Sequence, residues 1–141
     1  VIDIAGFTRI TEFSINEVIR MSGLTGISDW FARKEYDGNT PFMHMYLEMR
    51  PDASIKEADV LAEHLTVYFI HFDSDYSDLK KMLNIEPLQI TILPAGTMEA
   101  FRQATGKPVG RINPNPADVT QIKKIASKSR SESNEKEGKA V

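Results

Sequence analysis

Residues 27–49, ISDWFARKEYDGNTPFMHMYLEM, contain two segments rich in aromatic and apolar residues, separated by a short polar segment. The polar segment includes Asp37 and Gly38, a pair that is common in tight turns between antiparallel strands. The segments on either side, 27–36 and 42–49, have the composition of strands. This stretch therefore predicts a β-hairpin.

The second strand of this predicted hairpin has two different faces, because successive side chains of a strand point to opposite sides. One face carries Met43, Met45, Leu47 and Met49, and the other carries Phe42, His44, Tyr46 and Glu48. The Met and Leu face suits packing beneath helices. We expect the aromatic face on the open side of the sheet, where it docks a partner domain, packs at an edge or stacks RNA bases.

Strands and helices are predicted before the hairpin as well. Residues 1–5 have the alternation of a strand. Ser14 is a candidate N-cap with Glu17 as its capping-box partner, and Gly23 is a candidate helix stop. These positions predict a helix between the first strand and the hairpin.

After the hairpin, the longest predicted helix follows Ser54, again a candidate N-cap, and runs to Phe72. Its apolar residues recur at three- and four-residue spacing, which places them on one face; they include Leu61, Leu65 and Phe69. Further elements are predicted as a short helix in 73–83, a strand at 88–93, a helix at 98–105 ended by Gly106, and a short last helix at 117–126.

The predicted order is strand, helix, strand, strand, helix, strand. That order is typical of the ferredoxin-like βαββαβ sheet, an α+β fold with helices on one face of the sheet. The additional helices after residue 97 are expected as C-terminal extensions. The segment 127–141 is polar and almost free of large apolar side chains, so we expect a disordered tail.

Composition restricts the function classes. The chain has 141 residues and a formal net charge of −3, and Lys and Arg outnumber acidic residues only after residue 122. An acidic body argues against nucleic-acid binding, which requires neutralisation of phosphates. Cysteine is absent, and His44, His64 and His71 are scattered, so no metal site is predicted. No membrane span or secretory signal is visible, from which we expect a cytoplasmic protein.

Two positions in the last third of the chain are candidates for phosphate chemistry. In EPLQITILPAGTMEAF, residues 86–101, a strand is followed by Gly96 and Thr97. A single glycine falls short of a phosphate-binding loop, so a turn and a helix cap are the favoured roles. Lys107 lies in a predicted loop, where it either stabilises charge on a carboxylate or phosphate oxygen or is a solvated surface lysine.

Three segments together resemble a known family. GFTRITEFSINEVI, DWFARKEY with PFMHMYLEM, and EPLQITILPAGTMEAF follow one another in an order similar to the carboxy-terminal domain of bacterial auxin-responsive acyl-acid amido synthetases. These enzymes belong to the acyl-adenylate-forming superfamily. The resemblance covers roughly residues 1–116, and the chain begins within a strand-like run without an initiator methionine, so we expect a fragment of a longer protein.

The resemblance implies a function for residues 1–126 as a mobile lid. Family members bind ATP, Mg²⁺ and a carboxylic acid mainly in a large N-terminal domain of the same polypeptide, and transfer the acyl group to an amine or a thiol. The carboxy-terminal domain closes over that site and is expected to be inactive alone. No nucleic acid and no membrane is implied as a partner.

The resemblance also implies site residues. Arg9 and Glu12 match the hinge-proximal stretch. Lys107 is the nearest match to the family's catalytic lysine, and Arg111 to a basic residue at the substrate, although their spacing differs from the family's pattern. The alternative is a free-standing ferredoxin-like module that binds a ligand or a partner without catalysis.

Overall fold

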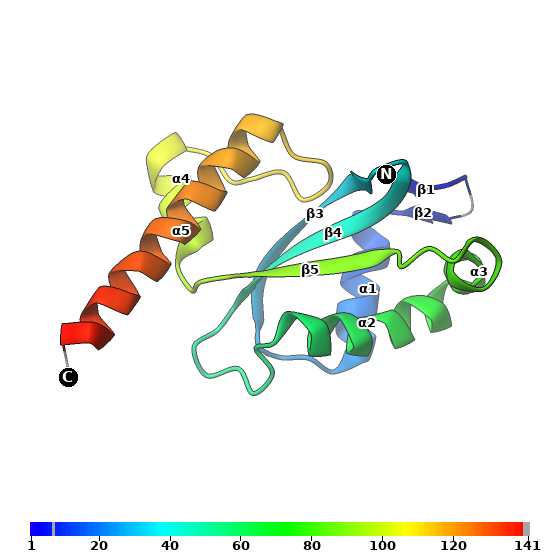
Figure 1. Ribbon diagram of the computed structural model, residues 1–141, viewed down its shortest axis with the longest axis horizontal. Helices are drawn as coiled ribbons and strands as arrows, with labels where there is room; N and C mark the ends of the chain where they lie inside the picture. The colour runs from blue at the N-terminus through cyan, green and yellow to red at the C-terminus, as the bar shows by residue number, and fades with distance from the viewer. Residues whose placement is uncertain (7, 140–141) are drawn as a thin grey trace.

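The computed structural model of the chain describes residues 1–6 and 8–139, with side chains described as far as Ser131. Its main sheet has the strand order β3–β4–β5, with β4 in the centre (Figure 1). β3 (Ile27–Asp37) and β4 (Thr40–Met49) form the predicted antiparallel hairpin. β5 (Leu88–Leu93) pairs with β4 in parallel.

The Met and Leu face of β4 carries the larger core, as the sequence predicts. α1 (Glu12–Ser22) and α2 (Ala58–Phe72) cover this face (Figure 1). Leu61, Leu65 and Phe69 of α2 are buried in the same cluster as the methionines of β4. α3 (Ser74–Leu83) contributes Tyr76 and Leu79.

The first predicted strand forms, but it pairs within a separate two-stranded sheet. β1 (Ile2–Ile4) is antiparallel to β2 (Thr8–Ile10). The chain reverses between them at Ala5 and Gly6, whose φ angles are 55° and 73°. The local turn brings the second strand beside the first, and their isoleucines join the core beneath α1. The fold as a whole is the expected ferredoxin-like α+β class.

The expectation that the aromatic face lies open is wrong. α4 (Thr97–Thr105) and α5 (Pro116–Lys139) pack on that face (Figure 1). Phe31, Tyr46 and Leu93 of the sheet form a second core with the apolar residues of the two helices, which include Phe101, Val119 and Ile122. The physical reason is that the apolar stripes of two amphipathic helices need an apolar surface, and the aromatic face supplies it.

Several helix starts differ from the predicted positions. At α4 the predicted cap was Thr97, but the N-cap is Gly96 and Thr97 is the first residue of the helix. The capping box of α1 joins Thr11 and Ser14, so the helix begins at Glu12 and Ser14 lies within it. α2 begins at Ala58, after Glu57, which makes no side-chain cap. Gly23 and Gly106 end their helices in the left-handed conformation, as predicted.

The last helix is longer than the sequence predicts. α5 begins at Pro116 and continues to Lys139, whereas the predicted end was residue 126. Between Pro116 and Ser131, Ala126 is the last buried residue. The predicted disorder of residues 127–141 stays a prediction, and residues 140–141 lie outside the described residues. In the described part of the chain, no helix has the length and apolar character needed to cross a membrane.

Candidate functional site

A polar cleft of about 470 Å³ lies between the sheet, α4 and the loop that joins α4 to α5. Asp29 and Glu48 line it from the sheet, Arg102 from α4, and Pro108 and Arg111 from the loop. We call it the Arg111 cleft. A smaller cavity of about 220 Å³ lies on the other side of Arg111, against α1. Arg111 therefore lines both spaces.

Arg111 makes four separate contacts that fix its guanidinium group. Nη2 lies 3.2 Å from Asp29 Oδ1, and Nε lies 3.6 Å from Glu12 Oε1. The guanidinium carbon lies 4.9 Å from the centre of the Trp30 ring, and Nη1 donates to the Trp30 carbonyl at 3.1 Å. The loop backbone is also held, because the Ala32 N–H donates to the Arg111 carbonyl at 2.8 Å. This network ties the loop to β3 and to the start of α1.

Glu48 is a buried carboxylate in the wall of the Arg111 cleft. Its Oε1 accepts a hydrogen bond from the Met98 N–H at 2.8 Å, and its Oε2 accepts one from the Ser28 hydroxyl at 2.9 Å. The N-cap of α4 is Gly96, which has no side chain to satisfy the first amides of the helix. Glu48 supplies that acceptor and a negative charge at the positive end of the helix dipole.

The structure brings together only some of the residues that the sequence nominated. Glu12 and Arg111 form an ion pair. Arg9 is exposed on β2, opposite Asp3 in the strand register. Lys107 forms an ion pair with Asp118, which lies at the start of α5, and the distance from Lys107 Nζ to Asp118 Oδ2 is 3.4 Å. The side chain of Lys107 is 59% exposed. Among the described residues, Lys107 does not line the Arg111 cleft, and its catalytic role stays a prediction.

A second polar cluster lies on the aromatic face, and the sequence did not predict it. His44 Nδ1 donates to Glu35 Oε1 at 3.0 Å, and its Nε2 lies 2.6 Å from the Thr91 hydroxyl. The Tyr46 hydroxyl donates to Glu35 Oε2 at 3.1 Å. Arg33 Nε lies 3.5 Å from the same oxygen. One carboxylate therefore holds three neighbours in place.

This arrangement shifts two pKa values. Burial alone would raise the pKa of Glu35, but the hydrogen bonds from His44 and Tyr46 and the charge of Arg33 lower it below its ordinary value. Burial, followed by the negative charge of Glu35, raises the pKa of the Tyr46 hydroxyl. Glu35 is therefore held as a carboxylate and Tyr46 as a neutral phenol.

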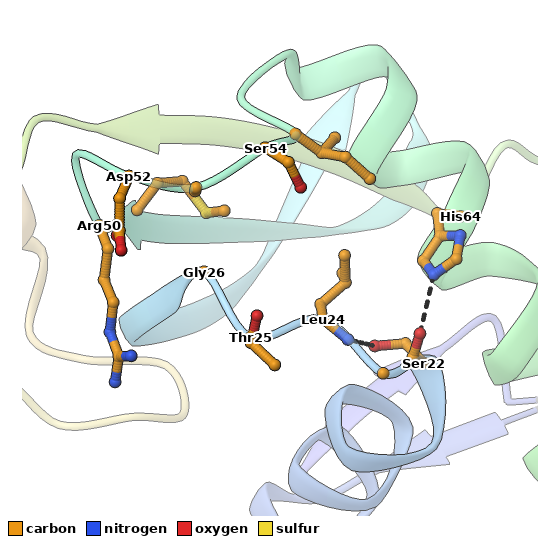
Figure 2. Close-up of a pocket in the computed structure, with 12 residues that line it drawn as sticks. Ser22, Leu24, Thr25, Gly26, Arg50, Asp52, Ser54 and His64 are labelled. Carbon is orange, nitrogen blue, oxygen red and sulfur yellow. Dashed lines mark hydrogen bonds between the residues drawn. The ribbon is translucent and has the colours of Figure 1, made fainter.

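A third cavity, of about 380 Å³, lies where the loops after α1 and after β4 meet α2 (Figure 2). His64 Nε2 donates to the Ser22 carbonyl at 3.0 Å. A side chain at Gly26 would place its Cβ 2.5 Å from that of Ala53, so the two loops require a glycine for their contact. In Figure 2 the Arg50 side chain extends away from the cavity. We interpret this space as a junction of packed loops.

A metal centre is not indicated by the side chains that the structure describes, because no three His, Asp or Glu residues gather closely enough there. In the Arg111 cleft, the side chains of Arg102 and Arg111 can make electrostatic contacts with a bound group. The Arg111 cleft has mixed charge and is open on one side, which suits contact with a polar surface or ligand.

Known proteins resemble the chain in structure, whereas no protein-family profile and no curated protein sequence matches it. A solved structure of GH3.15 acyl acid amido synthetase superposes with a TM-score of 0.55 over 80% of this chain, at 15% identity. The complex of AtGH3.15 acyl acid amido synthetase with 2,4-DB gives a TM-score of 0.53 over 80% of the chain, at 18% identity. The chain spans only 23% and 22% of these two proteins. It therefore shares its fold with one part of a larger synthetase.

Proposed function

We propose that this chain is the mobile C-terminal lid domain of an ATP-dependent acyl-adenylating synthetase. Such an enzyme activates a carboxylic acid as an acyl-adenylate and transfers the acyl group to an amine or a thiol. The observation that carries the proposal is the superposition of 80% of this chain on 23% of an acyl acid amido synthetase. ATP, Mg²⁺ and the acid would be bound mainly by the N-terminal domain of the same polypeptide.

The Arg111 network supports a lid that moves as one body. A lid that swings between two half-reactions must carry its contact loop without deforming it. The contacts of Arg111 with Glu12, Asp29 and Trp30 attach the loop to β3 and α1. In this proposal Arg9 and Glu12 lie near the hinge, and Arg111 faces the substrate side of the closed enzyme.

The ion pair of Lys107 is compatible with a role in the closed enzyme. The side chain of Lys107 is 59% exposed and its partner Asp118 lies at the start of α5. The Asp118 side chain is only 18% exposed, so the lysine is the more accessible member of the pair. On closing of the lid, the exposed ammonium group of Lys107 can exchange Asp118 for a carboxylate or phosphate oxygen.

The experiment that tests the proposal compares the chain with the longer polypeptide that contains it. The coding region that includes residues 1–141 and the sequence before Val1 is expressed, and acid-dependent exchange of pyrophosphate into ATP is measured with a panel of carboxylic acids. We expect exchange by the longer polypeptide and only background exchange by the isolated chain.

Two results would contradict the proposal. One is clear exchange by the isolated chain, which would make it a catalyst by itself. The other is a longer polypeptide that neither binds ATP nor catalyses exchange, which would favour the free-standing ferredoxin-like binding module.

A further inference from the structure

A cavity of about 300 Å³ lies between β4, β5 and α5, and it shares no lining residue with the Arg111 cleft. The sheet contributes His44, Tyr46, Thr91 and Leu93, and α5 contributes Lys123, Ala126 and Arg130. We call it the Lys123 pocket. Its volume is at the lower end of the range of small-molecule sites, about 300–1,000 Å³.

The Lys123 pocket is positively charged although the protein as a whole is acidic. Lys123 and Arg130 are seven residues apart on α5, which is two helical turns and places them on the same face. Among the residues as far as Ser131, whose side chains are described, no carboxylate lines the pocket. Within the part of the chain whose side chains are described, neither cation takes part in an ion pair. Two cations beside one small cavity therefore lack a compensating charge there.

Both cations are positioned by contacts that leave hydrogen-bond donors available. Lys123 Nζ lies 5.7 Å from the centre of the Tyr46 ring, which holds the ammonium group against the wall of the pocket. One amino group of Arg130 donates to the Ile92 carbonyl, which anchors the guanidinium over β5. An ammonium group has three donors and a guanidinium group five, so each retains donors for an anion.

The wall on the sheet side is rigid and largely apolar. The Tyr46 ring is stacked between Phe31 and His44, with ring centres 4.5 Å and 4.1 Å apart. The His44 ring is held by Glu35 and Thr91 at its two nitrogens. Leu93 and Ala126 complete the apolar part of the lining. A preformed wall lowers the entropic cost of binding a ligand.

We propose that the Lys123 pocket binds a small organic anion, with a compact apolar body and one carboxylate or phosphate group. Lys123 and Arg130 hold the anionic group by charge-assisted hydrogen bonds. The apolar body lies against the half-buried side chains of His44 and Thr91, since the other lining side chains Tyr46, Leu93 and Ala126 are almost fully buried. Inorganic phosphate alone would leave most of the cavity unfilled. This inference does not depend on the proposed lid function, because it uses other residues.

The test is a titration of the chain with three small-molecule probes, in which binding is monitored through the NMR chemical shifts of the backbone amides. Phenyl phosphate and benzoate carry an apolar ring with a phosphate or a carboxylate, and inorganic phosphate carries no apolar body. We expect saturable shifts at Thr91, Leu93 and Ala126, with a dissociation constant of about 1 mM or below for the better aromatic probe. Phenyl phosphate or benzoate, whichever binds more tightly, should bind about tenfold more tightly than inorganic phosphate, because its ring buries apolar area.

Variants separate this pocket from general attraction to a basic helix. Lys123→Gln and Arg130→Gln should each weaken binding of the better aromatic probe by about tenfold, since each removes a charge-assisted hydrogen bond. Lys124→Gln is the matched control: it removes the same charge from the next residue of α5, which does not line the pocket. The affinity of the Lys124→Gln variant for the better aromatic probe should stay within about twofold of the affinity of the unchanged chain.

Several outcomes would overturn the inference. They are the absence of saturable shifts for both aromatic probes, equal affinity for inorganic phosphate and the aromatic probes, and an equal loss of affinity in Lys124→Gln and Lys123→Gln. Circular dichroism confirms that the variants are folded. Because the three positions are exposed, substitution there should leave the fold intact.

Discussion

Glu48 connects the central strand to the start of α4 through the two oxygens of one buried carboxylate. Both oxygens accept hydrogen bonds, from the Met98 N–H and from the Ser28 hydroxyl. Glu48→Ala removes both acceptors. We expect a loss of about 1–3 kcal/mol in the free energy of unfolding, because the buried Met98 N–H would be left without an acceptor.

Urea unfolding measures this loss, with Glu63→Ala as the control. Glu63 is an exposed residue of α2, so its substitution should change stability by less than about 0.5 kcal/mol. Equal effects of the two substitutions would show that Glu48 does not act as the acceptor for α4.

Glu35 makes the stability of the chain depend on pH in the acidic range. Its pKa in the folded chain is below the ordinary value of 4.5. A carboxyl group with a lowered folded pKa contributes its full stabilisation above the unfolded pKa and loses it as pH falls through the folded pKa. We therefore expect the stability difference between the unchanged chain and Glu35→Gln to be largest near neutral pH and to shrink below 4.5.

Denaturant unfolding of both proteins at several pH values between neutral and about 3 checks this expectation. The hydrogen bonds from His44 and Tyr46 are the physical source of the effect. A stability difference that stays constant over the whole range would mean that these bonds do not stabilise the charged form of Glu35.

The α2 helix provides the clearest test of the larger core. Leu65 has no exposed surface and lies in the cluster that joins α2 to the methionines of β4. Leu65→Ala removes buried methyl groups and leaves a cavity, so we expect a loss of about 2–5 kcal/mol in the free energy of unfolding. Val67→Ala is the control, because Val67 is 61% exposed on the same helix. A loss below about 0.5 kcal/mol for Leu65→Ala would show that this face of α2 is not packed.

Elements with a strong local pattern were predictable from the sequence. The alternation and the Asp37–Gly38 turn predicted the hairpin of β3 and β4, and left-handed glycines marked the ends of α1 and α4. Helix starts were less predictable, because several residues near each start can act as caps. At α1, both Thr11 and Ser14 have suitable side chains, and the capping box forms with Thr11 as the N-cap. At α4 the capping oxygen comes from Glu48, and only the folded structure brings it there.

The path of the chain over the aromatic face was not predictable from local patterns. The sequence predicted α4 and α5 as C-terminal extensions but not the surface that they cover. The same limit applies to the candidate site. Arg111 and Glu12 were nominated separately, and the structure pairs them. Asp29 and Trp30 complete the Arg111 network through contacts between residues that are some eighty positions apart in the sequence. The periodicity of a sequence does not reveal contacts of this kind.

The proposed lid function is tested most directly at Lys107. In the longer polypeptide, Lys107→Ala should slow formation of the acyl-adenylate by about 10²–10³-fold, because a lysine at the reacting oxygens stabilises charge that develops in the transition state. The second half-reaction, started from preformed acyl-adenylate, should change much less, because the lid has by then moved the loop away. Single-turnover measurements of the two half-reactions check both expectations.

Lys80→Ala is the matched control for this measurement. Lys80 is 62% exposed and pairs with Glu86 at 3.0 Å, and Lys107 is 59% exposed and pairs with Asp118 at 3.4 Å. The two lysines are matched in exposure, whereas their partners differ, with Glu86 73% and Asp118 18% exposed. Equal rates for the two variants in adenylation would remove Lys107 from the catalytic assignment. Asp118→Asn tests the direction of the change in the adenylation rate. Because it weakens the resting ion pair of Lys107 and leaves the lysine itself in place, it should leave adenylation unchanged or make it faster, whereas a purely structural role of the pair predicts the same loss as Lys107→Ala.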